Sequence, residues 1–335
     1  MCKRIMAAQT NTEGGVPFYK IGTIGGKADA YISKDLFDEY KMKYSFPHKG
    51  EVMITCAGTV GKCIIYNGED SYYQDSNIVW IDNPNEIISN DFLYHLLSKI
   101  NWSHLNSTTI VRIYNDDLRN LKLYYPHHDE QKKITHLFQL INERIATQTK
   151  IIEKLQSLIK GIAQNIVLRN KPNVRISQCL ECSSSTLQES DVLEYGTYPV
   201  YGANGVVGFL DNYNTSNEAI YIIKDGSGVG AVSYVAGKCS ATGTLNILQA
   251  KKGFSLRYLY YLLNIFNFEP YKTGMAIPHI YFKDYGKAQI FCPSYSEQLK
   301  YAKFLATIDD KLLTEQNVLI NLSLQKQYLL RQMFI

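Results

Sequence analysis

Two glycine-bearing stretches are the first candidates for chemistry, because a glycine-rich loop can wrap a phosphate group. The run 226–230 reads GSGVG and leads into AVSYV, which is a strand pattern and not the start of a helix. A dinucleotide or S-adenosylmethionine loop needs a helix at that point, so we interpret the run as a turn or bulge. The stretch 56–63, CAGTVGKC, has Cys56 and Cys63 where a P-loop needs a glycine and a magnesium-binding hydroxyl. Neither stretch predicts a nucleotide site.

Metal and catalytic signatures are also weak. Cys179 and Cys182 are spaced as CxxC, but no second pair lies nearby in the sequence, so we expect no zinc site. His127 and His128 stand immediately before a helical pattern and are interpreted as part of a solvated turn. The sequence contains no Asn-Pro-Pro-aromatic motif of amino-methyltransferases, no helicase motif and no paired-carboxylate nuclease signature. Jointly, these observations argue against an enzyme.

The remaining chemistry is contact with a nucleic acid, in which Lys and Arg neutralise phosphates and polar side chains read base edges. Residues 1–128 carry 13 Lys or Arg against 14 Asp or Glu, and residues 169–295 carry 11 against 9, so neither region is basic in bulk. Phosphate affinity would then come from local patches or from a partner protein. One candidate patch contains Lys27, Lys34, Lys41, Lys43, His48 and Lys49, and another contains Lys224, Lys238, Lys251 and Lys252. For any one of these lysines the alternative is a solvated surface charge.

Length and composition limit the class of protein. The chain has 335 residues, of which 45% are hydrophobic and 20% charged, and its formal net charge is +4. These values predict two folded domains and exclude a highly basic nucleic-acid coat. The longest apolar candidate, residues 259–266, is too short to span a membrane, and the first residues lack the apolar stretch of a signal peptide. The seven Cys do not form an obvious disulfide framework, so we expect a reducing, cytoplasmic location and no membrane partner.

The elements that would position these residues occur twice. The segment 110–131, IVRIYNDDLRNLKLYYPHHDEQ, aligns without a gap with 277–298, IPHIYFKDYGKAQIFCPSYSEQ. Three shorter blocks keep the same order: 91–97 with 257–263, then 60–61 and 77 with 229–230 and 246, then 17–19 with 199–201. The chain is therefore an internal duplication. More sequence precedes the second copy, including a strand-like stretch at 174–179, so we expect the first copy to be clipped at its N-terminus and to lack an edge strand.

Each copy ends in a heptad pattern, in which seam residues alternate at spacings of four and three. The first seam contains Ile134, Phe138, Ile141, Ile145, Ile152, Leu155 and Ile159, and the second contains Leu305, Ile308, Leu312, Leu319, Leu322 and Leu329. A long helix with such a seam needs a partner, and we predict an antiparallel two-helix coil. The alternative is two separate helices, each packed on its own domain. Gln148 and Glu315 fall in the seams, and full overlap of the helices would place them opposite Leu319 and Ile152, in adjacent layers.

The predicted fold class is mixed α/β (α+β). Two β-rich domains would be separated by the coiled coil and related by a pseudo-two-fold axis. The predicted boundaries are 1–128 and 169–295 for the domains, and 129–168 and 296–335 for the helices. Strands are predicted at 51–55, 63–66, 78–81, 121–125, 219–223, 231–235, 245–248 and 288–291, and shorter helices at 89–99 and 255–265.

With these features the chain resembles the specificity subunit of type I restriction–modification systems over nearly its whole length. The resemblance rests on the block 277–298 and its twin 110–131, on the heptad helices that follow them, and on three short strings. These strings are SGVGAV (227–232), PFYKIG (17–22) and YPVYGANG (198–205). The shorter first copy departs from the family pattern.

The resemblance implies two target-recognition domains, each reading one half of a bipartite, asymmetric site in double-stranded DNA, with the helices setting the length of the spacer. It also implies that two modification (methyltransferase) subunits dock on the repeated regions and bring S-adenosylmethionine, and that restriction/motor subunits join them. This chain would supply no catalytic residue and bind no cofactor or metal. The alternatives are a coiled-coil scaffold or interaction protein that does not read DNA, and an independent DNA-modifying enzyme.

Comparison of the two copies suggests which residues contact DNA. Positions that are shared, such as Gly61 with Gly230 and Tyr114 with Tyr281, are interpreted as scaffold, and positions that differ, such as Arg112 with His279 and Thr59 with Gly228, as candidates for half-site readout. The alternative role for Arg112 is an ion pair with Asp116 or Asp117. The candidate DNA-binding residues are Lys27, Lys34, Lys41, Lys43, Lys49, Thr59, Lys62, Arg112, Tyr114, Asn204, Lys224, Ser227, Lys238, Lys252, His279 and Tyr281.

Overall fold

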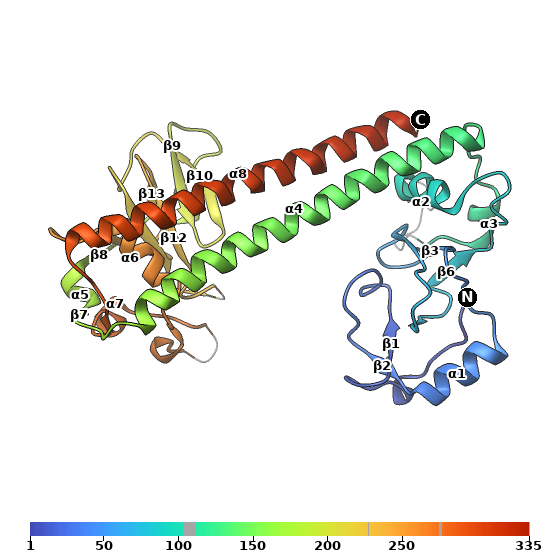
Figure 1. Cartoon of the computed structure of the whole chain (residues 1–335), viewed down its shortest axis with the longest axis horizontal. Helices are drawn as coiled ribbons and strands as arrows, with labels where there is room; N and C mark the ends of the chain where they lie inside the picture. The colour runs from blue at the N-terminus through green and yellow to red at the C-terminus, as the bar shows by residue number, and fades with distance from the viewer. Residues whose placement is uncertain (103–111, 227, 275–276, 335) are drawn as a thin grey trace. The chain divides into compact units, whose positions relative to one another are not determined.

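The computed structural model describes residues 1–102, 112–226, 228–274 and 277–334 (Figure 1). The chain divides into unit 1, Met1–Thr147 with Ile320–Ile335, and unit 2, Gln148–Leu319. Each unit contains one β-rich domain and one part of each of two long helices, α4 (His128–Leu168) and α8 (Tyr295–Met333). Within the described ranges, no helix has the length and apolar character of a membrane span.

Unit 2 is built on a four-stranded antiparallel sheet of order β12-β11-β14-β8, with a smaller sheet β10-β9-β13 and a two-stranded ribbon β15-β7. Its strands are β7 (Val174–Arg175), β8 (Leu180–Ser184), β9 (Tyr198–Gly202), β10 (Gly205–Leu210), β11 (Ala219–Ile223), β12 (Val232–Val235), β13 (Ser240–Ala241), β14 (Leu245–Ala250) and β15 (Gln289–Ile290). Its shorter helices are α5 (Ile176–Cys179), η3 (Glu189–Asp191), α6 (Leu256–Leu263), η4 (Glu269–Tyr271) and α7 (Phe282–Tyr285). The main core joins β11, β14 and α6 to the facing ends of α4 and α8.

Unit 1 has the same plan on a smaller scale, with sheets of order β4-β3-β6 and β2-β1-β5. Its strands are β1 (Val16–Tyr19), β2 (Tyr31–Ile32), β3 (Val52–Thr55), β4 (Cys63–Ile65), β5 (Tyr72–Tyr73) and β6 (Ile78–Ile81). Its shorter helices are η1 (Ala7–Gln9), α1 (Lys34–Lys43), α2 (Asn90–Lys99) and α3 (Asn115–Arg119). The chain is therefore a mixed α/β protein with a repeated domain, as the sequence predicts.

The strand registers define the duplication more closely than the sequence does. Thr55 of β3 pairs with Ile78 of β6, and Ile223 of β11 pairs with Leu245 of β14. Just beyond these pairs, the amide of Cys56 donates to Asn77 O at 2.7 Å, and the amide of Lys224 donates to Thr244 O at 3.0 Å. Thr244 is therefore the counterpart of Asn77, and the predicted match with Asn246 is wrong. Asn246 lies inside β14, opposite Ile222.

Two of the predicted strands are also wrong, for reasons of pairing. The stretch 174–179 is a strand only at Val174–Arg175 and then turns into α5, which buries Ile176 and Cys179 completely. The segment 121–125 forms no strand, although its counterpart in unit 2 contains β15. Strand β15 pairs with β7, and no counterpart of β7 pairs with segment 121–125 among the described residues of unit 1. The β4-β3-β6 sheet likewise has no counterpart of β8 in this part of the chain.

A buried glutamine anchors each long helix to its domain. The side chain of Gln131 accepts the amide N–H of Ser89 at 2.9 Å and donates to Ile87 O at 2.8 Å and Pro126 O at 3.0 Å. Gln298 repeats the arrangement with the amide of Ser255 at 2.9 Å and Pro293 O at 2.9 Å. Ser89 and Ser255 are also the N-caps of α2 and α6. The glutamine that ends each repeated block is thus a structural joint between the domain helix and the long helix.

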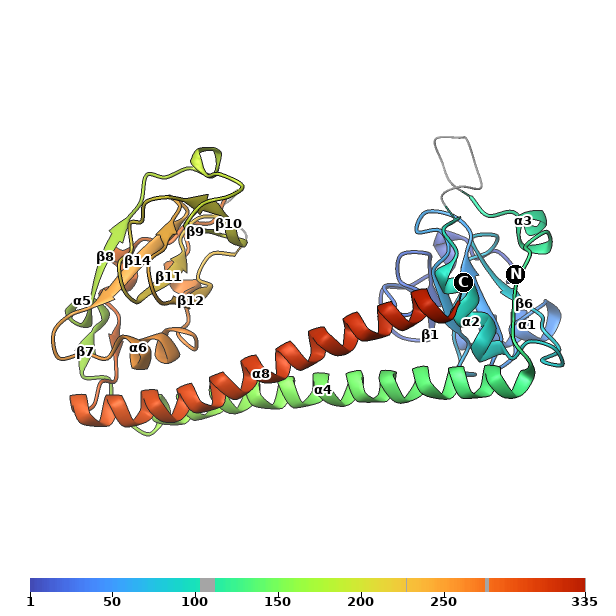
Figure 2. The ribbon, with the colours of Figure 1, turned by 90° about the horizontal axis from the view of Figure 1, so that it is seen from above.

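The long helices pack in antiparallel sense within each unit. In unit 1, Ile134 and Phe138 near the start of α4 share a core with Leu329, Met333 and Phe334 at the end of α8, beside α2 (Figure 2). In unit 2, the end of α4 packs with the start of α8 through Ile166 and Ala302. These helices pack on each other as well as on the domains, so the alternative of two separate helices is wrong. The predicted seam residues are all buried or half-buried: Ile134, Phe138, Ile141, Ile145, Leu322 and Leu329 in unit 1, and Ile152, Leu155, Ile159, Leu305, Ile308, Leu312 and Leu319 in unit 2.

The two polar seam residues meet directly, which corrects the predicted register. In unit 2, Gln148 Nε2 donates to Glu315 O at 3.0 Å and to the Glu315 carboxylate. Full overlap of the helices would have placed Gln148 opposite Leu319, so the observed register differs by about one helical turn. In the observed register the two polar side chains form a hydrogen bond with each other, whereas full overlap would have placed Gln148 opposite Leu319 and Glu315 opposite Ile152.

Candidate nucleic-acid interface

In unit 1 the loop between β3 and β4 lies against the segment 112–114. The amide of Ile113 donates to Cys56 O at 2.9 Å, and the Ile113 side chain is buried in the β3–α2 core. At the other end of the loop, Gly61 has φ +83°, and a Cβ on it would lie 2.1 Å from Trp102 Cδ1. Thr55 Oγ1 donates to Thr59 O and accepts the amide of Lys62 at 3.0 Å. Packing and hydrogen bonds therefore fix the loop at both ends, and Thr59 is exposed within it.

Half-buried Arg112 and exposed Tyr114 flank the buried Ile113. Arg112 Nη2 donates to Ser76 O at 3.3 Å, and the guanidinium carbon lies 5.9 Å from the centre of the Tyr114 ring, which is 58% exposed. Asp116 pairs with Arg119 at 3.5 Å, and Asp117 accepts the amide of Tyr114 at 2.7 Å. Burial raises the pKa of the Cys56 thiol to about 11, against the opposing charge of Arg112, so this thiol stays neutral. We call the β3–β4 loop together with residues 112–114 platform 1.

Unit 2 repeats this geometry with other side chains. The amide of Ile280 donates to Lys224 O at 2.9 Å, and Gly230, with φ +90°, packs against Phe268 as Gly61 packs against Trp102. His279 Nδ1 lies 2.8 Å from Asp225 Oδ1, and the His279 ring is stacked on Tyr281 at 6.4 Å and 27°. Lys283 Nζ lies 5.3 Å from the centre of the same tyrosine ring. We call the β11–β12 loop together with residues 279–281 platform 2; Ser227, a predicted contact residue in this loop, lies outside the described residues.

The two platforms bring together part of the predicted contact set. Thr59, Arg112 and Tyr114 meet in platform 1, and Lys224, His279 and Tyr281 meet in platform 2. Lys62 is the last residue of the β3–β4 loop in platform 1, and its ammonium donates to Ile24 O in the loop that also carries Lys27. Sequence reasoning missed Asp225, although its position directly before the glycine run placed it in the same loop.

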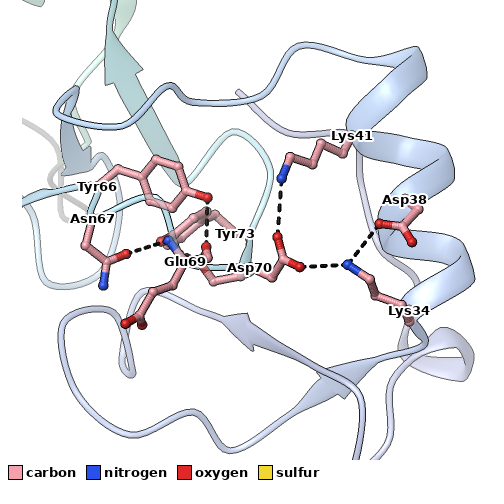
Figure 3. Close-up of polar contacts among 9 residues, drawn as sticks. Lys34, Asp38, Lys41, Tyr66, Asn67, Glu69, Asp70 and Tyr73 are labelled. Atoms are coloured by element: carbon pink, nitrogen blue, oxygen red, sulfur yellow. Dashed lines mark hydrogen bonds and ion pairs between the residues drawn. The ribbon is translucent and has the colours of Figure 1, made fainter.

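The lysines of α1 form a separate group whose charge is largely compensated (Figure 3). Lys34 Nζ lies 2.6 Å from Asp70 and 3.0 Å from Asp38, and Lys41 Nζ lies 3.3 Å from the other oxygen of Asp70. Lys43 pairs with Glu39 at 2.8 Å. Hydrogen bonds from the two lysines lower the pKa of Asp70, and those to Asp70 and Asp38 raise the pKa of Lys34. The predicted basic patch is therefore a mixed-charge network, and Lys49 contributes mainly its aliphatic stem, which covers Gly68.

The other predicted residues of unit 2 do not gather at platform 2. Asn204 is exposed in the turn between β9 and β10, on the smaller sheet. Lys238 Nζ lies over Tyr213 at 4.9 Å and Tyr198 at 5.9 Å, near the start of β9. Lys252 follows the end of β14, whereas the platform adjoins the start of that strand, so the expectation that Lys224 and Lys252 share one patch is wrong. Lys251 is tied to Ser177 O at 2.9 Å.

No cluster of three or more His, Cys, Asp or Glu side chains suited to a metal ion occurs within the described ranges. Each platform instead combines an exposed tyrosine ring with half-buried Arg, Lys or His side chains, which suit stacking and hydrogen bonding to a nucleic acid.

Comparison with known proteins gives the family. The model of the type I restriction modification DNA specificity domain matches residues 1–157 and again residues 173–322. The chain belongs to this family. Both copies of the specificity domain contain one platform, one domain helix and most of one long helix, so the duplication seen in the sequence is a duplication of this domain.

Two curated relatives carry related names. A putative type I restriction enzyme specificity subunit of Haemophilus influenzae is 44% identical over 168 residues, which cover 50% of this chain and 40% of the relative. The EcoprrI specificity subunit of Escherichia coli is 25% identical over 126 residues, covering 38% and 30% of the two chains. The matched regions thus span less than half of each relative.

Two solved structures share the fold. The type I restriction–modification S subunit of M. genitalium matches with a TM-score of 0.62 at 18% identity, covering 100% of this chain and 92% of that one. A structure described as showing complex assembly and conformational transition of the type I R-M system matches with a TM-score of 0.56 at 14% identity, covering 96% and 92%.

Proposed function

We propose that this chain is the DNA-specificity subunit of a type I restriction–modification complex, in which each unit reads one part of a bipartite, asymmetric DNA site. The observation that carries the proposal is the repetition of one backbone platform with different side chains. A shared scaffold with Arg112 and Thr59 in one copy and His279 and Gly228 in the other is suited to reading two different half-sites.

The side chains of the platforms have chemistry suited to this role. An arginine can donate two hydrogen bonds to O6 and N7 of guanine, and such a contact contributes about 1–3 kcal/mol of discrimination. Contacts with Tyr114 and Ser76 O hold the Arg112 guanidinium at the surface, which lowers the entropy lost on binding. The bond between His279 Nδ1 and Asp225 leaves Nε2 for a base or a phosphate. Lys224 would add a phosphate contact beside it.

The long helices offer the surface for protein partners. Outside the seam, large apolar side chains stay exposed, among them Leu137, Leu140, Leu324 and Tyr328 in unit 1, and Leu158, Phe304 and Leu313 in unit 2. Exposed apolar rows on helices are typical of interaction surfaces. We propose that two modification subunits dock on these helices and bring S-adenosylmethionine and methyl transfer, and that restriction/motor subunits join them. In this arrangement the chain is not catalytic, and its helices set the spacer between the half-sites.

Methylation mapping tests the proposal. The chain is co-expressed with its methyltransferase partner in a host without related enzymes, and methylated adenines are mapped across the genome. We expect one bipartite motif. Arg112→Ala should relax one half of it, at about 5- to 150-fold lower discrimination, and His279→Ala should change only the other half. Arg119→Ala, an exposed arginine of the same domain, is the matched control. Absence of any bipartite motif, or an unchanged motif in both variants, would contradict the proposal.

The alternative of a scaffold protein draws on the same exposed apolar helix residues, which could hold proteins together without DNA. Binding to a specific duplex as a function of salt separates the two functions. The DNA-reading function requires that affinity fall steeply with salt and that Arg112→Ala weaken binding to the cognate site more than to random DNA. A scaffold would show neither effect.

A further inference from the structure

The backbone of platform 2 holds the side chains of Asp225 and His279 together. The two residues face each other in an antiparallel bridge, and the amides of their chain neighbours Gly226 and Ile280 donate across it at 3.0 and 2.9 Å. In a pair of this kind, which exchanges no hydrogen bond of its own, the two side chains lie close together on one face. The backbone thus places His279 Nδ1 2.8 Å from Asp225 Oδ1.

The rest of the imidazole ring is also held in place. Tyr281 is stacked on the ring at 6.4 Å and 27°. Gly274, with φ +90°, approaches the ring edge opposite Nδ1, and a Cβ on it would lie 3.1 Å from His279 Cδ2. The His279 side chain is still 34% exposed, and none of the described residues forms a hydrogen bond with its Nε2. Nε2 is therefore the ring nitrogen that is available to a ligand.

The contact with Asp225 determines what Nε2 can bind. An ionised carboxylate has no proton to give, so Nδ1 must donate in this hydrogen bond. A neutral imidazole has only one N–H, and Nε2 is then an acceptor. Such an acceptor cannot donate to a phosphate oxygen. It can accept a proton from an exocyclic amino group, which is N6 of adenine or N4 of cytosine in the major groove, and N2 of guanine in the minor groove.

Unit 1 has a different pair of residues at these two positions. The repeated hydrogen bonding places Ala57 at the position of Asp225, and Arg112 at the position of His279. An arginine is always protonated and only donates, so no neighbour is needed to set its hydrogen-bonding character. A histidine can donate or accept at Nε2, and its neighbour decides between the two. The carboxylate is present in the copy that has the histidine.

We propose that Asp225 determines the base specificity of platform 2. By accepting Nδ1–H of His279 it fixes Nε2 as an acceptor, so that the platform selects a base with an exocyclic amino group. Asp225 acts through His279 and is thus a positioning residue. The inference rests on the proposed function, and it narrows the ligand of Nε2 from a base or a phosphate to one class of base edge.

Nuclear magnetic resonance of the full chain tests the tautomer without DNA. Histidine is labelled with ¹⁵N, and the His279 signals are identified by their loss in His279→Gln. We expect the ring proton on Nδ1 in the unaltered chain and on Nε2 in Asp225→Asn, because an asparagine amide can donate to Nδ1 and so favours the other tautomer. A proton on Nε2 in the unaltered chain, protons on both nitrogens at the pH of the binding assay, or the same tautomer in both chains would overturn the inference.

Binding of the half-site that His279→Ala alters tests the readout in the complex with the methyltransferase partner. Each adenine, cytosine or guanine of this half-site is replaced in turn by purine, pyrimidin-2-one or hypoxanthine, which lack the amino group. We expect one replacement to weaken binding about tenfold in the unaltered chain and less than about twofold in Asp225→Asn. The identity of the sensitive base shows which amino group is read. Asp211→Asn, which removes the same charge at an exposed position of unit 2, is the matched control and should behave as the unaltered chain does.

The outcomes separate this inference from the proposed function. If methylation mapping of the unaltered complex gives no bipartite motif, the proposed function fails, and this inference fails with it. If a motif is found but no amino group of the half-site matters, or Asp225→Asn depends on the same amino group as the unaltered chain, only this inference is overturned.

Discussion

Replacement of Gly61 by alanine should destabilise unit 1 much more than the same change at a second glycine of that unit. Gly61 has φ +83°, which costs an L-residue about 1–2 kcal/mol. Its new Cβ would also lie 2.1 Å from Trp102 Cδ1, and the Trp102 side chain is only 5% exposed, so the indole must shift within a packed core. Such overpacking costs about 1–3 kcal/mol. Alanine in place of glycine recovers about 0.4–1 kcal/mol through the unfolded chain, so we expect a net loss of about 2–4 kcal/mol.

The matched control is Gly14→Ala. Gly14 has φ +77°, but a Cβ added to it would have no atom within 4 Å, so this variant carries the backbone strain without the clash. We expect a loss of about 1 kcal/mol or less. Both tryptophans of the chain, Trp80 and Trp102, belong to unit 1, so tryptophan fluorescence during urea unfolding reports on that unit. Equal midpoints for the two variants would refute the claim that Gly61 is required by contact with Trp102.

Three further changes probe other parts of the fold. Gln131→Ala should destabilise unit 1 by about 2–4 kcal/mol in the same urea assay, because the amide of Ser89 and the carbonyl of Ile87 lose a buried partner. The control is Gln139→Ala, at an exposed position of the same helix. Similar losses of stability in the two variants would contradict the structural role of Gln131. Replacing both Gln148 and Glu315 by leucine should lower the free energy of unfolding by less than the sum of the two single replacements. We expect a coupling energy of about 1–3 kcal/mol in a double-mutant cycle measured by thermal unfolding. Additive effects would show that the two side chains do not interact. Burial, and to a lesser extent the charge of Lys326, lowers the pKa of His95 in the folded chain to about 4. Between pH 4 and about 6.5, His95 is therefore protonated in the unfolded chain but neutral in the folded one. The stability of unit 1 is therefore fully present above this window and falls by about 3 kcal/mol as pH drops through it. His95→Phe should reduce this loss, and an unchanged pH profile would contradict the assignment.

The parts of the fold that the sequence predicts are those set by local pattern. The heptads define α4 and α8 to within a residue or so, and β6 and β11 begin and end where the β-branched runs do. The register of the helices could not be predicted in this way, because a heptad repeats and each one-turn shift preserves the seam. The bond between Gln148 and Glu315 selects one register from this series.

Properties that depend on distant partners escaped prediction. Segment 121–125 has strand-forming residues, but a strand needs a neighbour, and the β7 that its counterpart pairs with lies before the second copy. The basic character of α1 was overestimated because Asp70, which contacts Lys34 and Lys41, is about thirty residues away in the sequence. Arg112 and His279 became candidates for half-site readout because the two copies could be compared position by position, and this stays a prediction.

The joints made by Gln131 and Gln298 have a consequence for how such chains diversify. Among the described residues, the side chain of each glutamine bonds only to main-chain atoms of its domain and of the residues before the helix. These atoms are Ser89 N, Ile87 O and Pro126 O in one copy, and Ser255 N and Pro293 O in the other. Main-chain atoms are the same whatever side chains a domain carries. Genetic exchange could therefore replace a whole domain by a foreign one of the same backbone, and the new domain would still be fastened to the resident helix.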